Sequence, residues 1–203
     1  MSESFTEINV FLSCPDEIIT KTNFKDIIEN ELKAVNTYYK DLFGVCFDLK
    51  HWKKNPILGR GVPRVQDVIN QYLIKNCDIY IGILWKSFGN PPGRNANGIE
   101  YSSGTEEEYY FAKDLNLELW FFFYNPRADL DIDSEGIAKI KKFKDQLKKD
   151  QIWYVEFDSG DNLIEFLQKS IARYVNGRYS IPLKKASQFK LKREDFRKLN
   201  RGF

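Results

Sequence analysis

Residues 78–85 read Asp78-Ile79-Tyr80-Ile81-Gly82-Ile83-Leu84-Trp85, a run that is apolar at almost every position. A strand of a parallel sheet has this pattern when helices cover both faces of the sheet. A long loop rich in Gly, Pro and Asn follows over residues 86–104, and an acidic helix start comes directly after it. The run therefore predicts a central parallel strand in an α/β fold.

Apolar runs and amphipathic segments alternate on both sides of this strand. Strands are predicted at residues 8–13, 45–49, 78–85, 117–124 and 152–157. Apolar residues at helical spacing predict helices at residues 23–43, 64–75, 105–115, 134–149 and 162–175. Five strand-then-helix units predict a flavodoxin-like α/β fold, with a five-stranded parallel sheet and helices on both faces. We expect this domain to span residues 1–178, followed by a basic tail over residues 179–203.

The composition limits the cellular compartment and the kinds of functional site that we expect. The chain has 203 residues, and it contains no apolar run near the roughly 18 residues that a bilayer-spanning helix needs. Its three cysteines, Cys14, Cys46 and Cys77, form no C-x-x-C pair, and His51 is the single histidine. We therefore expect a cytoplasmic protein with no membrane partner and no metal site.

The charge of the chain is uneven. The formal net charge is +2, yet residues 184–201 hold eight Lys or Arg and two Asp or Glu. A basic tail of this kind can contact nucleic acid, a partner or a neighbouring subunit. Charge runs are commonly solvated segments, so we expect a solvated tail and keep nucleic acid as the alternative partner.

The helix start at Ser102-Ser103-Gly104-Thr105-Glu106-Glu107-Glu108 has two interpretations. Thr105 and Glu108 have the T-x-x-E spacing of a capping box, which predicts Thr105 as the helix cap. Three adjacent carboxylates repel one another, however, and one cap needs only one of them. A carboxylate at this edge of the sheet can also serve a reaction that develops positive charge. Both interpretations stay open at this point.

Other candidate residues follow the predicted strands at the same edge, where open α/β sheets bind their ligands. The candidate substrate-binding residues of these loops are Ser13, Cys14, Asp16, Trp52, Trp85 and Phe88. The three aromatic residues among them can stack on a flat ring. Arg60 and Arg64 can meet phosphates, although exposed arginines are usually only solvated.

Four segments resemble one known family. They are V-F-L-S-C-P-D-E at 10–17, V-P-R-V-Q-D-V-I-N at 62–70, C-D-I-Y-I-G-I-L-W-K-S-F-G at 77–89 and S-G-T-E-E-E-Y-Y-F-A at 103–112. Their order and spacing resemble the bacterial TIR-like domains, in the variant found in prokaryotic defence proteins. The resemblance covers about residues 7–175 and implies a flavodoxin-like fold.

The resemblance also implies an activity. Many TIR-like domains cleave the nicotinamide–ribose bond of NAD with a glutamate in the helix after the third strand, and Glu108 matches that position. The Trp-Cys pair of the common form is absent, and Gly104-Thr105 stands in its place. Nucleoside deoxyribosyltransferases are more distantly similar, since they carry G-T-x-x-E with the glutamate as nucleophile. Both resemblances imply chemistry through an oxocarbenium-like transition state that a carboxylate stabilises.

The resemblance thus implies an NAD-cleaving enzyme with Glu108 as the catalytic residue, acting in antiviral defence or signalling. Glu106 is expected as a second ribose contact, and Thr105 is counted among the substrate-binding residues. NAD is a substrate, so no cofactor is expected. The resemblance further implies a homo-oligomer formed through the loop at residues 53–63, and a separate effector or sensor protein as a partner. The alternatives are a non-catalytic self-assembly module and an N-glycosidase that acts on another nucleoside or nucleotide.

Overall fold

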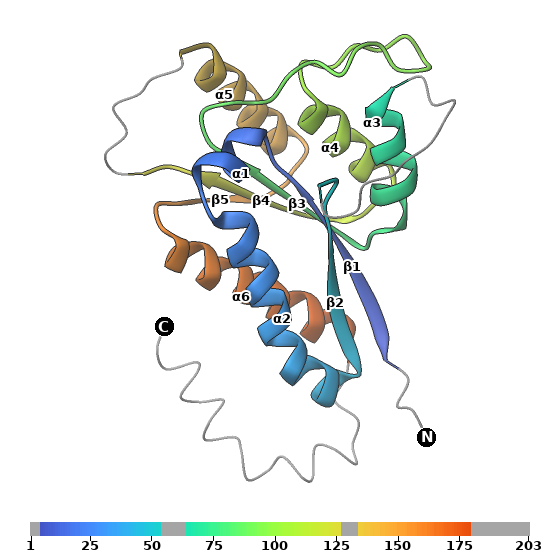
Figure 1. Cartoon of the computed structure of the whole chain (residues 1–203), viewed down its shortest axis with the longest axis vertical. Helices are drawn as coiled ribbons and strands as arrows, with labels where there is room; N and C mark the ends of the chain where they lie inside the picture. Colours follow the sequence, from blue (N-terminus) through green and yellow to red (C-terminus); the bar gives the residue numbers. More distant parts are fainter. Residues whose placement is uncertain (1–4, 54–63, 127–133, 180–203) are drawn as a thin grey trace.

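A five-stranded parallel sheet forms the centre of the molecule in a computed structural model that describes residues 5–53, 64–126 and 134–179 (Figure 1). The strand order is β2-β1-β3-β4-β5, and all four pairings are parallel. The strands are β1 Thr6–Ser13, β2 Val45–Lys50, β3 Ile79–Leu84, β4 Glu118–Tyr124 and β5 Tyr154–Phe157. The predicted flavodoxin-like sheet is confirmed, with strand ends within two residues of those predicted.

Helices cover both faces of the sheet (Figure 1). On one face lie α1 Asp16–Lys21, α2 Phe24–Phe43 and α6 Gly160–Arg178. On the other face lie α3 Val65–Val68, the π-helical turn η1 Ile69–Leu73, the 3-10 turn η2 Ile74–Asn76, α4 Gly104–Asp114 and α5 Ser134–Lys149. None of the helices in the described part of the chain is both long and apolar enough to cross a membrane.

Two elements differ from the prediction. The short helix α1 lies between the strand predicted at residues 8–13 and the helix predicted at residues 23–43, where no helix is predicted. Asp16 and Glu17 are in its first turn, where carboxylates favour the helix dipole. The helix predicted over residues 64–75 changes its winding at Ile69, where a π-helical turn follows α3. Apolar spacing predicts helical structure but not this change, and π-helical turns are frequent at functional sites.

A close contact joins β3 to β4 in the apolar core between the sheet and the helices α4 and α5. An added Cβ at Gly82 would lie 2.5 Å from Phe121 Cε1, so the missing side chain makes room for the buried Phe121 ring. Tyr109 of α4 and Phe143 of α5 pack edge-on against the same ring. The aromatic layer thus holds α4 against the sheet and sets the position of the helix that carries the three adjacent glutamates.

Candidate functional site

The site lies between β1 and β3, the neighbouring strands whose chain connections run to opposite sides of the sheet. Ser13 ends β1 and pairs in register with Gly82 of β3. Open α/β sheets bind ligands at such a point, outside the carboxyl ends of the strands. The buried polar side chains that the structure describes lie on the segments of this edge: Ser13, His51, Gln66, Asn70, Lys86, Ser103, Thr105, Glu107 and Glu108.

The cap of α4 is Ser103, so the prediction that Thr105 caps this helix is wrong. Ser103 has an extended backbone, and its Oγ accepts the backbone N–H of Glu106 at 3.0 Å. The Glu106 carboxylate accepts hydrogen bonds from the backbone N–H and the Oγ of Ser102, each at 2.6 Å. The first of the three glutamates therefore serves the helix start, by binding back to Ser102, the residue before the cap. Its predicted role as a ribose contact is not supported by this orientation.

Glu107, the second glutamate, is bound by Arg64. The Arg64 guanidinium donates to Glu107 at 2.7 and 3.1 Å, to the Asp67 carboxylate at 2.5 and 3.3 Å, and to the Gly93 carbonyl at 2.7 Å. These five bonds use all five N–H groups of the guanidinium. Arg64 is therefore a structural cation that joins α3, α4 and the loop before α4, and it has no N–H left for the phosphate considered above.

Glu108, the third glutamate, is bound by neutral side chains. Its side chain accepts hydrogen bonds from the Ser13 hydroxyl and from the Gln66 amide, the latter at 3.0 Å. Burial raises the pKa of Glu108 to about 7, while the bonds from Ser13 and Gln66 hold it down and the charge of Glu107 raises it further. A carboxyl group that titrates near neutral pH at a ligand-binding edge is a candidate for chemistry.

Gln66 links the second and third glutamates. Its Nε2 donates to Glu108 Oε1 and, at 3.1 Å, to Asn70 Oδ1, and Asn70 Nδ2 donates to Glu107 Oε1 at 3.1 Å. Both amides are buried and lie four residues apart in the helical segment before β3. The prediction missed them because amides on an amphipathic helix normally indicate its solvent face; the spacing Gln66-x-x-x-Asn70 directly after Arg64 was the available signal.

Cys14 and His51 lie together but do not form an activated pair. Cys14 Sγ is 3.9 Å from His51 Nε2, and Lys53 donates its backbone N–H to His51 Nδ1 at 3.2 Å. In the neutral ring the proton then sits on Nε2, facing the sulfur. Burial raises the pKa of Cys14 to about 12 and lowers that of His51 to about 4. Both groups are therefore neutral at pH 7, and the thiol lacks the thiolate character that a nucleophile needs.

The remaining candidates divide into core and surface residues. Phe88 is 3% exposed and packs on Phe143 with ring centroids 4.9 Å apart, so its position does not support the predicted stacking role. Trp85 is partly buried against the apolar core between the sheet and the helices α1, α2 and α6. The Lys86 ammonium lies 4.4 Å from the centroid of its ring. Trp52 is exposed beside Lys53.

Asp16 lies at the start of α1, with its side chain exposed and bound to Lys53 at 2.7 Å. Of the residues predicted for the site, Ser13 and Glu108 touch one another, whereas Asp16, Trp52 and Phe88 are engaged with other parts of the chain. The predicted oligomer loop, apart from Lys53, and the predicted tail, apart from Tyr179, lie outside the described residues.

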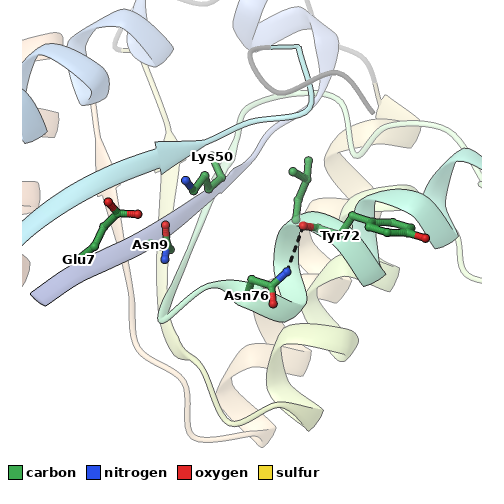
Figure 2. A pocket seen from close by; sticks show the side chains of 6 residues that line it. Glu7, Asn9, Lys50, Tyr72 and Asn76 are labelled. Carbon is green, nitrogen blue, oxygen red and sulfur yellow. Dashed lines mark hydrogen bonds between the residues drawn. The ribbon is translucent and has the colours of Figure 1, made fainter. Parts of the chain in front are cut away.

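A separate pocket of about 320 Å³ lies on β1 and β2, beside η1 and η2 (Figure 2). It is lined by Glu7, Asn9, Lys50, Tyr72, Leu73 and Asn76. Figure 2 shows Asn76 donating to the Tyr72 carbonyl, at 3.3 Å, on the helical side of the pocket. Lys50 is already paired with Asp48. The pocket therefore involves none of the residues that surround Glu108.

Comparisons with known proteins give a family. Residues 63–172 match the family described as "Domain of unknown function (DUF4062)". No curated protein is similar enough to count as a relative. Among solved structures, the chain is similar to the translation elongation factor SelB of Methanococcus maripaludis, in its apo form, with 11% identity and a TM-score of 0.45. That similarity covers 88% of this chain and 35% of the elongation factor, so this chain spans about a third of its length.

Proposed function

We propose that this chain, which belongs to the DUF4062 family of domains of unknown function, cleaves the N-glycosidic bond between nicotinamide and ribose in NAD, with Glu108 as the catalytic residue. One observation carries the proposal: of three adjacent glutamates, Glu108 is the one that is buried among neutral partners at the ligand-binding edge. The resemblance of residues 7–175 to TIR-like domains supports NAD as the substrate.

The other two glutamates are bound in structural contacts, so Glu108 is the one of the three that we assign to catalysis. Glu106 binds back to Ser102 at the start of α4, and Glu107 is paired with Arg64. Each oxygen of the Glu108 carboxylate accepts one hydrogen bond from the protein. Because a carboxylate oxygen has two acceptor positions, both oxygens can still accept a hydrogen bond from a ribose hydroxyl.

Cleavage of NAD needs little acid catalysis at the leaving group. The nicotinamide ring of NAD is positively charged, and it leaves as neutral nicotinamide when the bond to the anomeric carbon breaks. Positive charge then spreads over the ribose ring carbon and oxygen. The Glu108 carboxylate stabilises that charge, and the low dielectric of a buried site strengthens the attraction.

Water completes the reaction. It adds to the anomeric carbon and releases a proton, so that NAD and water give ADP-ribose, nicotinamide and a proton. If the adenine ring attacks in place of water, the product is a cyclic isomer of ADP-ribose. Glu108 has to be ionised for either path, so the rate rises with pH through the region near 7 where this carboxyl titrates.

A second candidate is a non-catalytic interaction module. The observation that favours it is the closed state of the site, because Glu108 is only 7% exposed and both of its oxygens are bonded. A module of this kind predicts that the substitution Glu108→Gln leaves every measurable property unchanged apart from stability.

The test uses the full chain at high concentration, so that any assembly needed for activity can form. NAD is added, and the products are separated by chromatography. Release of nicotinamide with ADP-ribose or its cyclic isomer is the expected result. Release of a base from nucleosides in parallel reactions, with NAD left intact, would move the assignment to a nucleoside N-glycosidase. No release from any of these substrates would contradict the catalytic proposal.

A further inference from the structure

We propose that Gln66 is a positioning residue for Glu108, and that the absence of a side chain at Gly104 is what lets it act. This inference rests on the proposed function, since it assigns a role toward the same carboxylate. The carboxylate is held from two sides, by Ser13 at the end of β1 and by Gln66 from α3. Two donors on separate elements fix its plane better than one.

Gln66 is itself held in one orientation. Its two amide protons go to Glu108 Oε1 at 3.0 Å and to Asn70 Oδ1 at 3.1 Å. The reversed orientation of the amide would point its oxygen at the Glu108 carboxylate and remove both bonds. Asn70 is in turn fixed by Glu107, which Arg64 binds. The amide that touches Glu108 therefore ends a chain of buried hydrogen bonds that starts at a guanidinium.

Gly104 provides the space for this amide. It is the first residue of α4, and an added Cβ there would lie 2.7 Å from Gln66 Oε1. Cβ atoms do not approach an oxygen so closely, so one of the two must move. The atom in the way is the end of a flexible side chain, so the Gln66 amide can move aside, and in moving it gives up its bonds to Glu108 and Asn70. Alanine at position 104 is therefore expected to displace the Gln66 amide while α4 stays folded.

A substitution at Gly104 can therefore displace the Gln66 amide without unfolding α4. Gly104 does not touch Glu108 through a side chain, and alanine favours a helix over glycine. A loss of activity in Gly104→Ala would therefore report the displaced amide. Gly177 of α6 offers a matched control, because an added Cβ there meets nothing within 4 Å.

The experiment compares the full chain with Gly104→Ala, Gln66→Leu, the double variant and Gly177→Ala. The titration of the Glu108 carboxyl is followed by carbon NMR on glutamate-labelled protein, with the signal assigned by its loss in Glu108→Gln. The Gln66 bond holds the pKa of Glu108 down. We expect Gln66→Leu and Gly104→Ala both to raise that pKa, the double variant to match Gln66→Leu, and Gly177→Ala to leave it unchanged.

Kinetics on NAD provide the second measurement. We expect Gly104→Ala and Gln66→Leu to lower kcat about 100-fold with KM unchanged, because a carboxylate displaced by about 1 Å loses its geometry with the reacting carbon. An unshifted Glu108 titration in Gly104→Ala, or additive shifts in the double variant, would overturn the inference. If Gly104→Ala fails to fold, an unshifted titration in Gln66→Leu overturns it instead. Absence of NAD cleavage by the unsubstituted chain would refute the proposed function, and the titrations would still decide the role of Gln66.

Discussion

Glu107 and Glu108 are adjacent in the chain but are bound by opposite kinds of partner. The Arg64 guanidinium binds Glu107 at 2.7 and 3.1 Å, whereas neutral groups of Ser13 and Gln66 bind Glu108. Glu108 has only neutral donors to offset its burial, so its pKa rises to about 7. This division of partners gives two adjacent carboxyl groups with different surroundings, one paired with a cation and one bound only by neutral donors.

Removal of the Arg64 cation should destabilise the fold. In Arg64→Met, Glu107 would stay buried without its cation, and we expect a loss of about 3 kcal/mol in the free energy of unfolding. The double variant Arg64→Met with Glu107→Met should recover most of that loss, because no buried charge remains. Urea denaturation measures both values. The exposed pair of Lys139 with Glu135 provides the control, since Lys139→Met should cost less than about 1 kcal/mol. A loss in Arg64→Met no larger than in this control would contradict the structural role.

The contact between Gly82 and Phe121 predicts a second stability effect. In Gly82→Ala, the new Cβ would lie 2.5 Å from a ring atom of Phe121, which is 1% exposed and packed against Tyr109 and Phe143. The ring cannot move aside without displacing its neighbours, so we expect a loss of about 1–3 kcal/mol. Thermal and urea unfolding check this value, with Gly177→Ala as a control that should lose no stability, because its Cβ meets nothing and alanine favours a helix. An unchanged midpoint in Gly82→Ala would show that the sheet absorbs the methyl group.

Burial of Glu108 predicts a pH dependence of stability. Its pKa is about 7 in the folded chain and near 4.5 in the unfolded chain, so the folded state binds more protons between these values. The contribution of this group to stability is fully present below pH 4.5, and it is lost as the pH rises to about 7 and beyond. The difference in unfolding free energy between the unsubstituted chain and Glu108→Gln should therefore change by about 3 kcal/mol from pH 4 to pH 8. A difference that is constant with pH would contradict the raised pKa.

Burial of His51 predicts that stability changes with pH in the opposite direction. Its pKa is lowered from 6.5 to about 4 by burial, so the unfolded state binds more protons between these values. The contribution of His51 to stability is present above pH 6.5 and is lost as the pH falls toward 4. The two groups offset one another in the unsubstituted chain between pH 4.5 and 6.5. In Glu108→Gln the His51 contribution is no longer offset by Glu108, and stability should fall steadily as urea unfolding is repeated from pH 6.5 down to 4. A flat profile in that variant would show that His51 is not held neutral.

The sequence predicted the fold because its signals are periodic and local. Continuous apolar runs marked β3 and β4, and helical spacing marked α2, α5 and α6, so the parallel sheet followed from the order of elements. The edge that carries Ser13 and Glu108 followed from the sheet. Each of these predictions depends on patterns within one element.

The parts that the prediction missed depend on contacts between elements. Ser103 and Thr105 are both acceptable caps with a glutamate three residues on, and the extended backbone at Ser103 decides between them. The polar side chain of Gln66 is typical of a surface residue, and it is buried only because α4 packs over it. Phe88 comes from a polar loop, yet it fills a space beside Phe143 that only the packing of α5 creates.

The catalytic role of Glu108 is tested most directly by the initial rate of nicotinamide release from NAD by the full chain, measured for the unsubstituted protein, Glu106→Gln and Glu108→Gln. Glutamine keeps the size of the side chain and removes its charge at either position. We expect Glu108→Gln to lower the rate by about 1000-fold, since it loses the charge that stabilises the cationic transition state. Glu106→Gln should stay near the unsubstituted rate, because that carboxylate is bound to Ser102 at the start of α4. Full activity in Glu108→Gln would contradict the account.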